Sequence, residues 1–415
     1  MLREKTIFIK LTKIIFTKST KISKRKLSRM VIFALLCSSI NFVNNTYAKE
    51  RSIDESDLSA KAAVLIDGEN GRILFGKNEK EKRAMASTTK IMTCIVALEN
   101  CKANQVVEIS SKAASMPKVK MNVMKGEQYY LKDLLYAMML ESYNDVAVAV
   151  AESIGGNIEN FAKMMNEKAK KIGANNTSFV TPNGLDAKEH YSTAYDMAKI
   201  GAYAIKNKSF LEIINTKKYN FTEIKNKRNI TVFNKDNFLN LENDAIGIKT
   251  GFTCNAGYCF VGAIKNNGRT FVSCVLSSGW PPNKGYKWKD TIKLMDYGKD
   301  NYEFKNIIEK NKPIMLPVEN GIKSEIKCTL DSSLKALVSN EDKINIKTKI
   351  DYKLPINVKD KVGSVWVYIN NKKVKNIKII SKEKVYKFDF TYCLRKALSY
   401  FILQGNSKRN KANIL

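Results

Sequence analysis

Two apolar hairpins enclose a long helical region in this chain, and this order restricts the fold more than any other feature. The runs "AAVLI" and "RILFG" flank Asn70-Gly71, a strong signal for a tight hairpin turn. Two further apolar runs, "AGYCFVGAI" and "RTFVSCVLSS", are joined by a "KNNG" turn. Because hairpin strands are antiparallel, we expect both hairpins to contribute to one antiparallel sheet with helices packed on it.

Between the hairpins, apolar residues recur at intervals of three and four, which indicates helices. One helix is expected to begin near Ser87 and to carry Met92, Ile95, Val96 and Leu98 on one face. Further helical patterns cover 129–142, 144–155, 157–173 and 192–205, and a short closing helix covers 290–298. The sequence therefore predicts an α+β domain over roughly residues 60–290.

The last quarter of the chain has a different pattern. Beyond about residue 300, short β-rich segments recur at roughly ten-residue spacing, which predicts a small all-β sandwich. A final segment, 386–404, reads as an amphipathic helix with a basic flank. Its apolar face consists of Leu394, Ala397, Leu398, Phe401 and Ile402. This helix could dock on the β domain or lie in a membrane interface, and we favour the membrane because the face is partly aromatic.

The first 48 residues have the pattern of a secretory signal peptide. A Lys- and Arg-rich region precedes the apolar run "MVIFALLCSSINFV", and small residues end at Ala48. The apolar run is shorter than the roughly 20 residues that a spanning helix needs. An uncleaved N-terminal anchor is the alternative, and with either reading we expect the remainder of the chain to be exported.

Charge and residue usage exclude several classes of site. The formal net charge is +31, which reflects either lysine spread over a solvated surface or attraction to a polyanionic partner such as an anionic membrane or wall polymer. There is no nucleic-acid-binding motif. The chain contains one histidine, His190, and no CxxC pair, so neither a metal site nor a cofactor is expected. The scattered cysteines suggest free buried thiols.

A serine and a lysine near the start of the first helix form a possible nucleophile and base. Ser87 and Lys90 are one helical turn apart, so both lie on one face of a helix. A serine needs a base to become nucleophilic, and a lysine whose pKa is lowered by burial can serve. The spacing alone is weak evidence, because the same pattern occurs at Ser23, Ser115, Ser324, Ser332 and Ser381.

Two further motifs single out Ser87. Ser142 and Asn144 form a Ser-x-Asn triplet at the junction of two helical patterns. Lys249-Thr250-Gly251 opens the second apolar hairpin and occurs once. The three motifs stand in the order found in penicillin-binding enzymes.

With these motifs the chain resembles the D-alanyl-D-alanine carboxypeptidases, the low-molecular-mass penicillin-binding proteins of serine peptidase family S11. The resemblance runs from about residue 60 to 383 and includes the blocks "RAMASTTKIMT", "TPNGLDAKEHYSTAYDMA" and "GIKTGFTCNAGYCFVGA". It implies a signal peptide over 1–48, a penicillin-binding serine peptidase domain over 49–297, a β-sandwich domain over 298–385 and the membrane-associating helix over 386–404. The implied substrate is a peptidoglycan pentapeptide ending in D-Ala-D-Ala, with β-lactams as inhibitors.

The resemblance also implies a role for each motif residue. Ser87 attacks the carbonyl of the penultimate D-Ala, Lys90 takes its proton, and Ser142 relays that proton to the departing D-Ala. Asn144 holds the substrate backbone, and Lys249 with Thr250 receives the terminal carboxylate. Gly251 lets the substrate approach the strand, and the backbone N–H groups of Ser87 and Phe252 form the oxyanion hole. Lys90 and Lys249 disfavour each other's charge, which helps to keep Lys90 neutral.

Three residues near these motifs need separate comment. His190 is the only histidine that could act as a base, but it lies in a block that resembles a structural segment, so we expect a structural hydrogen bond instead. Tyr143 and Phe252 are larger or less polar than is common in the family. Both are expected to flank the cleft, where they would affect substrate preference.

Two other functions are compatible with the motifs. A class A β-lactamase shares them, but it needs a glutamate that activates a deacylating water, and the only candidate, Glu212 in "EIIN", has the wrong spacing. A non-catalytic wall-binding protein could keep the fold, but it should show a broken motif, and all three motifs are intact.

Overall fold

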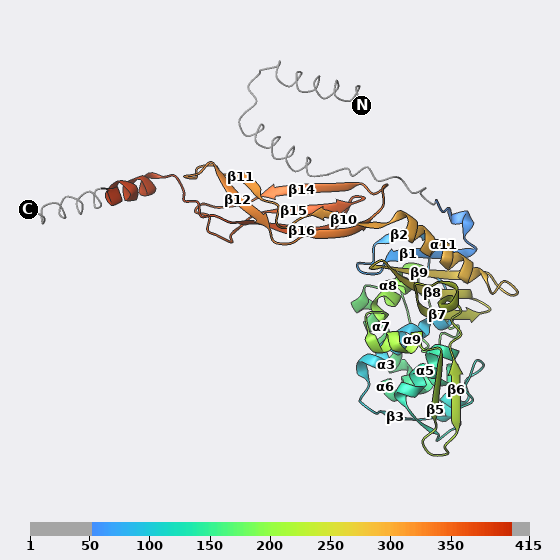
Figure 1. Cartoon of the computed structure of the whole chain (residues 1–415). Helices are drawn as coiled ribbons and strands as arrows, with labels where there is room; N and C mark the ends of the chain where they lie inside the picture. The colour runs from blue at the N-terminus through green and yellow to red at the C-terminus, as the bar shows by residue number, and fades with distance from the viewer. Residues whose placement is uncertain (1–51, 401–415) are drawn as a thin grey trace, which may run out of the picture. The chain divides into compact units, whose positions relative to one another are not determined.

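The computed structural model describes residues 52–400, so the expected signal peptide lies outside the described residues (Figure 1). Within this range the chain forms two compact units. The larger unit runs to Phe304 and includes Leu337–Asn340, and the smaller comprises Lys305–Ala336 and the residues from Glu341 onward.

A five-stranded antiparallel sheet organises the larger unit. Its strand order is β2-β1-β9-β8-β7, so the two predicted hairpins lie in one sheet and β7 forms an edge. The strands are β1 (Ala60–Asp67), β2 (Ile73–Lys77), β7 (Ala245–Thr253), β8 (Gly257–Asn266) and β9 (Arg269–Ser278). The predicted α+β class is confirmed.

The region between the hairpins is mainly helical, as the apolar spacing indicates. Its main elements are the 3-10 helix η2 (Ala86–Thr89) and the helices α3 (Lys90–Asn100), α4 (Ser111–Ala114), α5 (Leu131–Glu141), α6 (Asn144–Gly155), α7 (Ile158–Ile172), α8 (Ala194–Ala204), α9 (Lys208–Asn215) and α10 (Phe238–Leu241). Two small hairpins interrupt it, β3 (Val106–Glu108) with β4 (Gln128–Tyr130), and β5 (Lys218–Thr222) with β6 (Asn229–Phe233). After the sheet, α11 (Tyr286–Asn301) follows.

The sheet has a core on each face because its strands alternate side chains between the two faces. On one face, Val64 and Val261 pack into the large cluster formed with the central helices. On the other face, Leu65 and Phe260 pack with Leu294 of α11. The alternation places two helical layers around one sheet.

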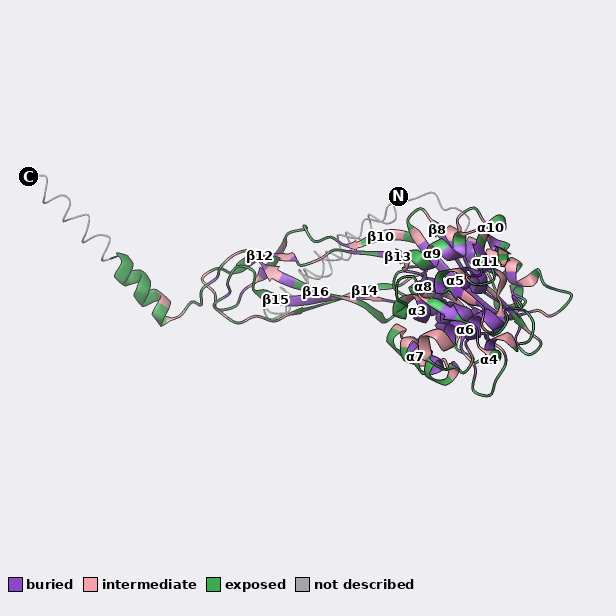
Figure 2. Ribbon diagram, turned by 90° about the horizontal axis from the view of Figure 1, so that it is seen from below, coloured by how far each residue is buried: buried purple, intermediate pink, exposed green. Residues whose placement is uncertain are grey.

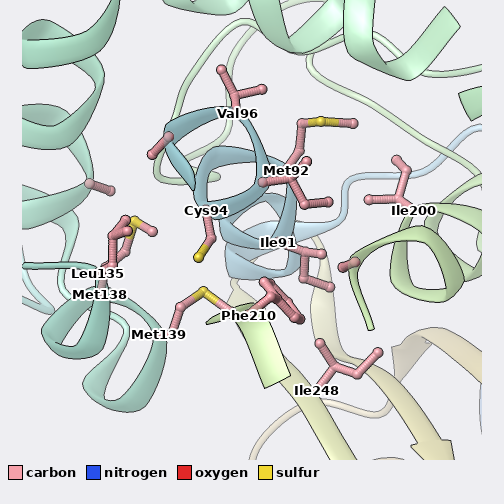
Figure 3. Packing of buried hydrophobic residues seen from close by; sticks show 14 of the residues in the cluster. Ile91, Met92, Cys94, Val96, Leu135, Met138, Met139, Ile200, Phe210 and Ile248 are labelled. Atoms are coloured by element: carbon pink, nitrogen blue, oxygen red, sulfur yellow. The ribbon is translucent and has the colours of Figure 1, made fainter. Parts of the chain in front are cut away.

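Helix α3 runs through the centre of the larger cluster (Figure 3). Ile91, Met92 and Cys94 of α3 are fully buried. They face side chains of three other helices and one strand, namely Leu135, Met138, Met139, Ile200, Phe210 and Ile248. Each fully buried side chain of this size contributes about 1.5–3 kcal/mol. The first turn of α3, which begins at Lys90, is thereby fixed.

The smaller unit is built from β-strands, so the expected C-terminal β domain is confirmed. Its five-stranded sheet has the order β11-β12-β16-β15-β14, and β10 pairs with β13. The strands are β10 (Glu303–Ile308), β11 (Ile314–Pro317), β12 (Glu325–Leu330), β13 (Leu334–Val338), β14 (Ile344–Ile350), β15 (Lys361–Ile369) and β16 (Lys372–Ser381). Buried and exposed residues alternate along β12, as expected for a sheet with one face in the core.

A helix over residues 390–400 follows the β-strands, and its described side chains are almost all exposed (Figure 2). Phe390 is 80% exposed, and Leu394 and Leu398 are about half exposed. A helix docked through this face would bury those leucines. Phe401 and Ile402, which complete the predicted apolar face, lie outside the described residues. Between residues 52 and 400, no helix is both long and apolar enough to span a bilayer.

The seven cysteines in the described part of the chain are free. Cys94, Cys259, Cys274 and Cys328 are buried, as expected, whereas Cys101, Cys254 and Cys393 are exposed. The expectation of buried thiols is therefore wrong for these last three. Over residues 52–400 there is also no group of three or more His, Cys, Asp or Glu side chains suited to a metal ion.

Candidate active site

Ser87 lies in η2, a 3-10 turn that leads directly into α3. The turn begins at Ala86, whose φ of 47° is left-handed, and the Thr88 N–H donates to the Met85 carbonyl. Gly184 makes room for this backbone, because a Cβ at that glycine would lie only 2.0 Å from the Ala86 oxygen. The predicted helix therefore starts three residues later than expected, and Ser87 precedes it with a partly exposed side chain.

Lys90 is completely buried and its amine contacts three oxygens. The Nζ atom lies 2.9 Å from Ser87 Oγ, 2.9 Å from Asn144 Oδ1 and 2.6 Å from the Asn183 carbonyl. Burial lowers the Lys90 pKa well below its usual value, and the charge of Lys249 lowers it further. A neutral amine keeps two N–H donors and one lone pair. Asn144 and Asn183 can accept from the two donors, which leaves the lone pair for the Ser87 hydroxyl.

Ser142 occupies the junction between α5 and α6 in a left-handed conformation, with φ of 69°. Its Oγ is buried and has no hydrogen-bond partner among the described residues. The structure brings Asn144 to Lys90, but it shows no bond from Ser142 to Ser87 or Lys90. Catalytic hydrogen bonds often form only once substrate is bound.

Lys249 lies on the edge strand β7 and is 3% exposed. Its amine makes no hydrogen bond or ion pair with any described residue. Burial lowers its pKa to about 8, although the charges of Asp236 and Glu141 act in the opposite direction. A buried cation without a bonded partner is suited to binding an anion. The next residue, Thr250, is partly exposed and can offer a hydroxyl.

Gly251 packs against the serine turn, which gives an additional reason for a glycine here. A Cβ at Gly251 would lie 2.9 Å from the Ser87 nitrogen and 3.0 Å from the Thr88 nitrogen. The missing side chain thus allows β7 to approach η2. The following residue, Phe252, is 40% exposed and its ring packs on Tyr258 at 4.7 Å.

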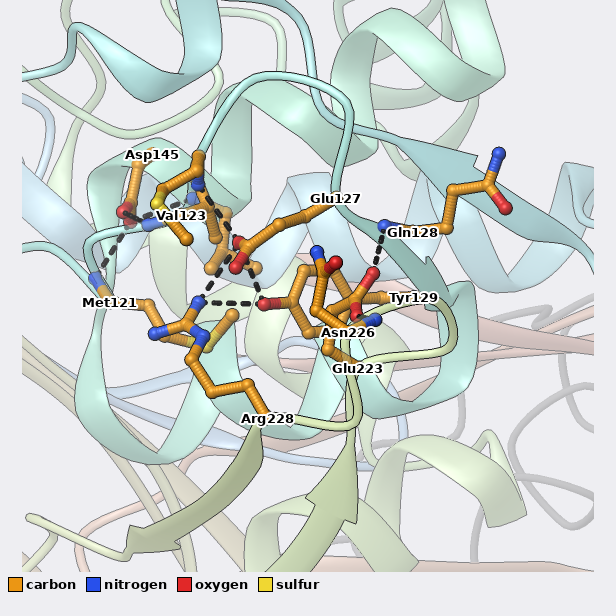
Figure 4. A network of polar contacts seen from close by, with 11 residues as sticks. Met121, Val123, Glu127, Gln128, Tyr129, Asp145, Glu223, Asn226 and Arg228 are labelled. Atoms are coloured by element: carbon orange, nitrogen blue, oxygen red, sulfur yellow. Dashed lines mark hydrogen bonds and ion pairs between the residues drawn. The ribbon is translucent and has the colours of Figure 1, made fainter.

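Two groups that hold the site together are not apparent from the motifs. The Asn183 carbonyl accepts from Lys90, but a backbone oxygen leaves no signature in the sequence. Asp145 is fully buried and accepts from the backbone N–H groups of Met121 and Val123, which fixes the preceding loop against α6 (Figure 4). An acidic residue directly after the Ser-x-Asn triplet is the signal that could have identified it.

The same loop is held at its far end by a second polar network (Figure 4). Glu127 is buried and accepts from the Tyr129 hydroxyl and from Arg228, both at 2.9 Å. Its carboxylate also accepts from the Met124 N–H at 2.8 Å. Together with Asp145, this network fixes both ends of the segment that leads to α5.

His190 has a structural role, which confirms the expectation. Its Nδ1 accepts the backbone N–H groups of Val180 and Thr181, so Nε2 carries the proton and donates to Thr89 Oγ1. Burial lowers the His190 pKa to about 4, so the ring is neutral. With Nδ1 occupied by two donors, the ring has no free acceptor for a serine proton.

A cavity of about 560 Å³ lies away from these residues, between the end of α3, α5 and α9. None of the predicted site residues lines it. Glu212, the one candidate for a β-lactamase glutamate, borders this cavity and accepts from the Tyr136 hydroxyl at 3.0 Å. Glu212 is therefore engaged with Tyr136 at a cavity that the predicted site residues do not line.

Comparison with known proteins gives the same assignment as the site. The family model for D-alanyl-D-alanine carboxypeptidases matches residues 48–279, and that for the penicillin-binding protein 5 C-terminal domain matches residues 302–387. The chain is 30% identical to the D-alanyl-D-alanine carboxypeptidase DacF of Bacillus subtilis over 388 residues, which cover 90% of this chain and 98% of that protein.

Comparison with solved structures gives the same family. The D-alanyl-D-alanine carboxypeptidase DacD of Francisella tularensis has a TM-score of 0.66 and 26% identity, and covers 84% of this chain and all of that one. Penicillin-binding protein 5 of Haemophilus influenzae has a TM-score of 0.65 and 27% identity, and covers 81% of this chain and all of that one. These matches and the contact between Ser87 and Lys90 lead to one conclusion: the chain belongs to the D-alanyl-D-alanine carboxypeptidase family and is a serine-type carboxypeptidase.

Proposed function

We propose that the protein removes the terminal D-alanine from peptidoglycan pentapeptides through an acyl-enzyme on Ser87. The observation that carries this proposal is the 2.9 Å contact between Ser87 Oγ and the buried Lys90 amine. The Ser87 oxygen attacks the carbonyl carbon of the penultimate D-Ala while its proton passes to Lys90. The C–N bond to the last D-Ala then breaks, and the departing amine receives a proton through Ser142. Water hydrolyses the resulting ester.

Binding of the substrate carboxylate is assigned to Lys249 and Thr250. A free carboxylate needs a fixed cation and a hydroxyl donor, and the buried, unbonded amine of Lys249 supports this role. Asn144 would hold the substrate backbone, and the N–H groups of Ser87 and Phe252 would stabilise the oxyanion. The close packing of Gly251 against η2 supports a fixed spacing between those two backbone segments.

Labelled penicillin and a synthetic peptide ending in D-Ala-D-Ala test the proposal together. We expect the label to modify the purified protein and to be absent from Ser87→Ala, and we expect D-alanine to be released from the peptide. Equal labelling of Ser87→Ala would overturn the mechanism. Fast penicillin turnover without release of D-alanine would point to a β-lactamase instead.

We further propose that the protein is exported and associates with the outer face of the membrane through its C-terminal helix. The exposed apolar residues Phe390, Leu394 and Leu398 support this, as do the neighbouring basic residues Arg395 and Lys396. Vesicles that contain anionic lipid should sediment the full chain but not Leu394→Glu/Leu398→Glu. Equal sedimentation of both proteins would contradict the proposal.

A further inference from the structure

Asp236 is a buried carboxylate that has no role in the mechanism described so far. It lies between β6 and α10 and is 7% exposed. Its Oδ1 accepts the Phe238 N–H at 3.0 Å, whereas Oδ2 is buried without a partner among the described residues. An unpaired buried carboxylate oxygen destabilises a fold. The bond from the Phe238 N–H therefore does not explain why a charged residue stands here.

The unpaired oxygen faces the edge strand that carries Lys249. A Cβ at Gly247 would lie 3.5 Å from Asp236 Oδ2. Gly247 and Lys249 are two residues apart on β7, so they share one face of the strand, about 7 Å apart. Asp236 thus packs on the face of β7 that also carries Lys249, yet the two residues form no direct ion pair. The Lys249 amine remains available for another anion.

The other charges that act on this pair come from two helices, α11 and α5. Lys287 of α11 and Lys249 both lower the Asp236 pKa, which burial raises to about 7. Glu141, at the end of α5, acts on Lys249 together with Asp236, and it is itself paired with Lys235 at 3.3 Å. Lys287 donates to the Lys284 carbonyl. Of the two acidic groups that act on Lys249, Asp236 is therefore the buried one, while Glu141 is partly exposed and paired with Lys235.

We propose that Asp236 is a positioning residue for the reaction, a buried counter-charge that keeps Lys249 protonated so that its amine can receive the substrate carboxylate. The proposal rests on the proposed role of Lys249. Because no direct bond joins the two groups, the carboxylate supplies charge without occupying the amine.

The proposal predicts the direction in which the pH dependence of kcat/KM should shift. Binding requires protonated Lys249, so kcat/KM falls as pH rises through the Lys249 pKa. Removing the Asp236 charge lowers that pKa further, and the fall then begins at lower pH. At pH 6 the effect is small, because Lys249 stays protonated in both proteins and Asp236 is largely protonated in the native protein.

The test is the pH profile of Asp236→Asn on a peptide ending in D-Ala-D-Ala, from pH 6 to 9. Asparagine retains an oxygen for the Phe238 N–H. We expect the alkaline limb of the profile, where kcat/KM falls as pH rises, to move to lower pH by about one unit. At pH 8 this lowers kcat/KM by up to about tenfold through a higher KM. At pH 6 we expect kcat/KM to change by no more than about twofold. Asp133→Asn is the matched control, because it neutralises a half-buried aspartate that accepts from Tyr219 and does not act on Lys249.

An unchanged alkaline limb in Asp236→Asn, or an equal loss at every pH, would overturn the proposal. If the asparagine variant does not fold, Asp236→Ser removes the same charge while keeping an acceptor, and the same criteria apply. Penicillin labelling separates this inference from the proposed function. Failure of the native protein to label at Ser87 refutes the function, whereas normal labelling with an unchanged limb refutes only the role of Asp236.

Discussion

The two compact units place their charges differently. The larger unit buries several charged side chains, and these include Lys90, Lys249, Asp145 and Asp236. In the β-strands of the smaller unit, over residues 305–400, the buried polar side chains are two serines, Ser364 and Ser381. Burying a charge costs several kcal/mol unless it is well paired. The larger unit therefore carries buried charges that are costly to the fold, and one of them, Lys90, contacts Ser87.

The largest effect should follow from removing the buried base. We expect Lys90→Met to lower the rate of penicillin acylation by about 10³-fold or more, because the serine loses its proton acceptor. Thermal unfolding should shift little, since an apolar chain of similar length replaces a buried amine. A large loss of stability with retained acylation would mean that Lys90 is structural.

A substitution on the edge strand β7 should lower activity by changing the position of β7 relative to η2. Gly251→Ala places a Cβ 2.9 Å from the Ser87 nitrogen, so β7 or η2 must move. We expect about a 100-fold loss in acylation, and overpacking should cost about 1–3 kcal/mol. Gly285→Ala is the control, because a Cβ there meets no atom within 4 Å. Equal behaviour of both variants would contradict the packing described here.

His190 allows a test in which stability and catalysis should separate. Its pKa is about 4 in the folded protein and about 6.5 when unfolded, so it is neutral in the folded protein. The stability linked to this residue is present above pH 6.5 and is lost as pH falls toward 4, by up to about 3 kcal/mol. Urea unfolding of His190→Asn should lack this dependence, while acylation at pH 7 changes only a few-fold. Loss of acylation at normal stability would make His190 catalytic.

The smallest effect should come from a lysine of the smaller unit. Lys347 on β14 is exposed and lies over the ring of Tyr368 at 5.3 Å. Lys347→Gln should change the free energy of unfolding by less than about 0.5 kcal/mol and leave peptide hydrolysis unchanged. A marked change in hydrolysis of the soluble peptide would show that the charges of the two units act together.

The sequence predicts the elements that are rich in apolar residues and misses those that are mostly polar and exposed. Helix α6 matches its predicted range because Val146, Val148 and Val150 lie in a continuous apolar run. The β5–β6 hairpin was missed, since its short strands are mostly exposed and bear Lys and Asn. The start of α3 was placed too early because the left-handed Ala86 has no compositional signal.

The candidate site divides in a similar way. The side chains of Ser87, Lys90 and Asn144 are brought together, and their motifs are visible in the sequence. The Asn183 carbonyl was not predictable, because every residue carries the same backbone oxygen. The position of Gly251 was predicted, but its packing on the serine turn was not, since only the folded chain shows what its Cβ would meet.

The contact between β7 and the serine turn makes reactivity dependent on complete folding. Ser87 and Lys90 are close in sequence, but Lys249 and Gly251 come from β7, which pairs with β8 at the edge of the sheet and lies late in the larger unit. On the proposed mechanism, a chain whose edge strand β7 has not docked has a serine but no anion site. Covalent penicillin labelling would then count native molecules, so the label can serve as a folding assay during refolding or secretion.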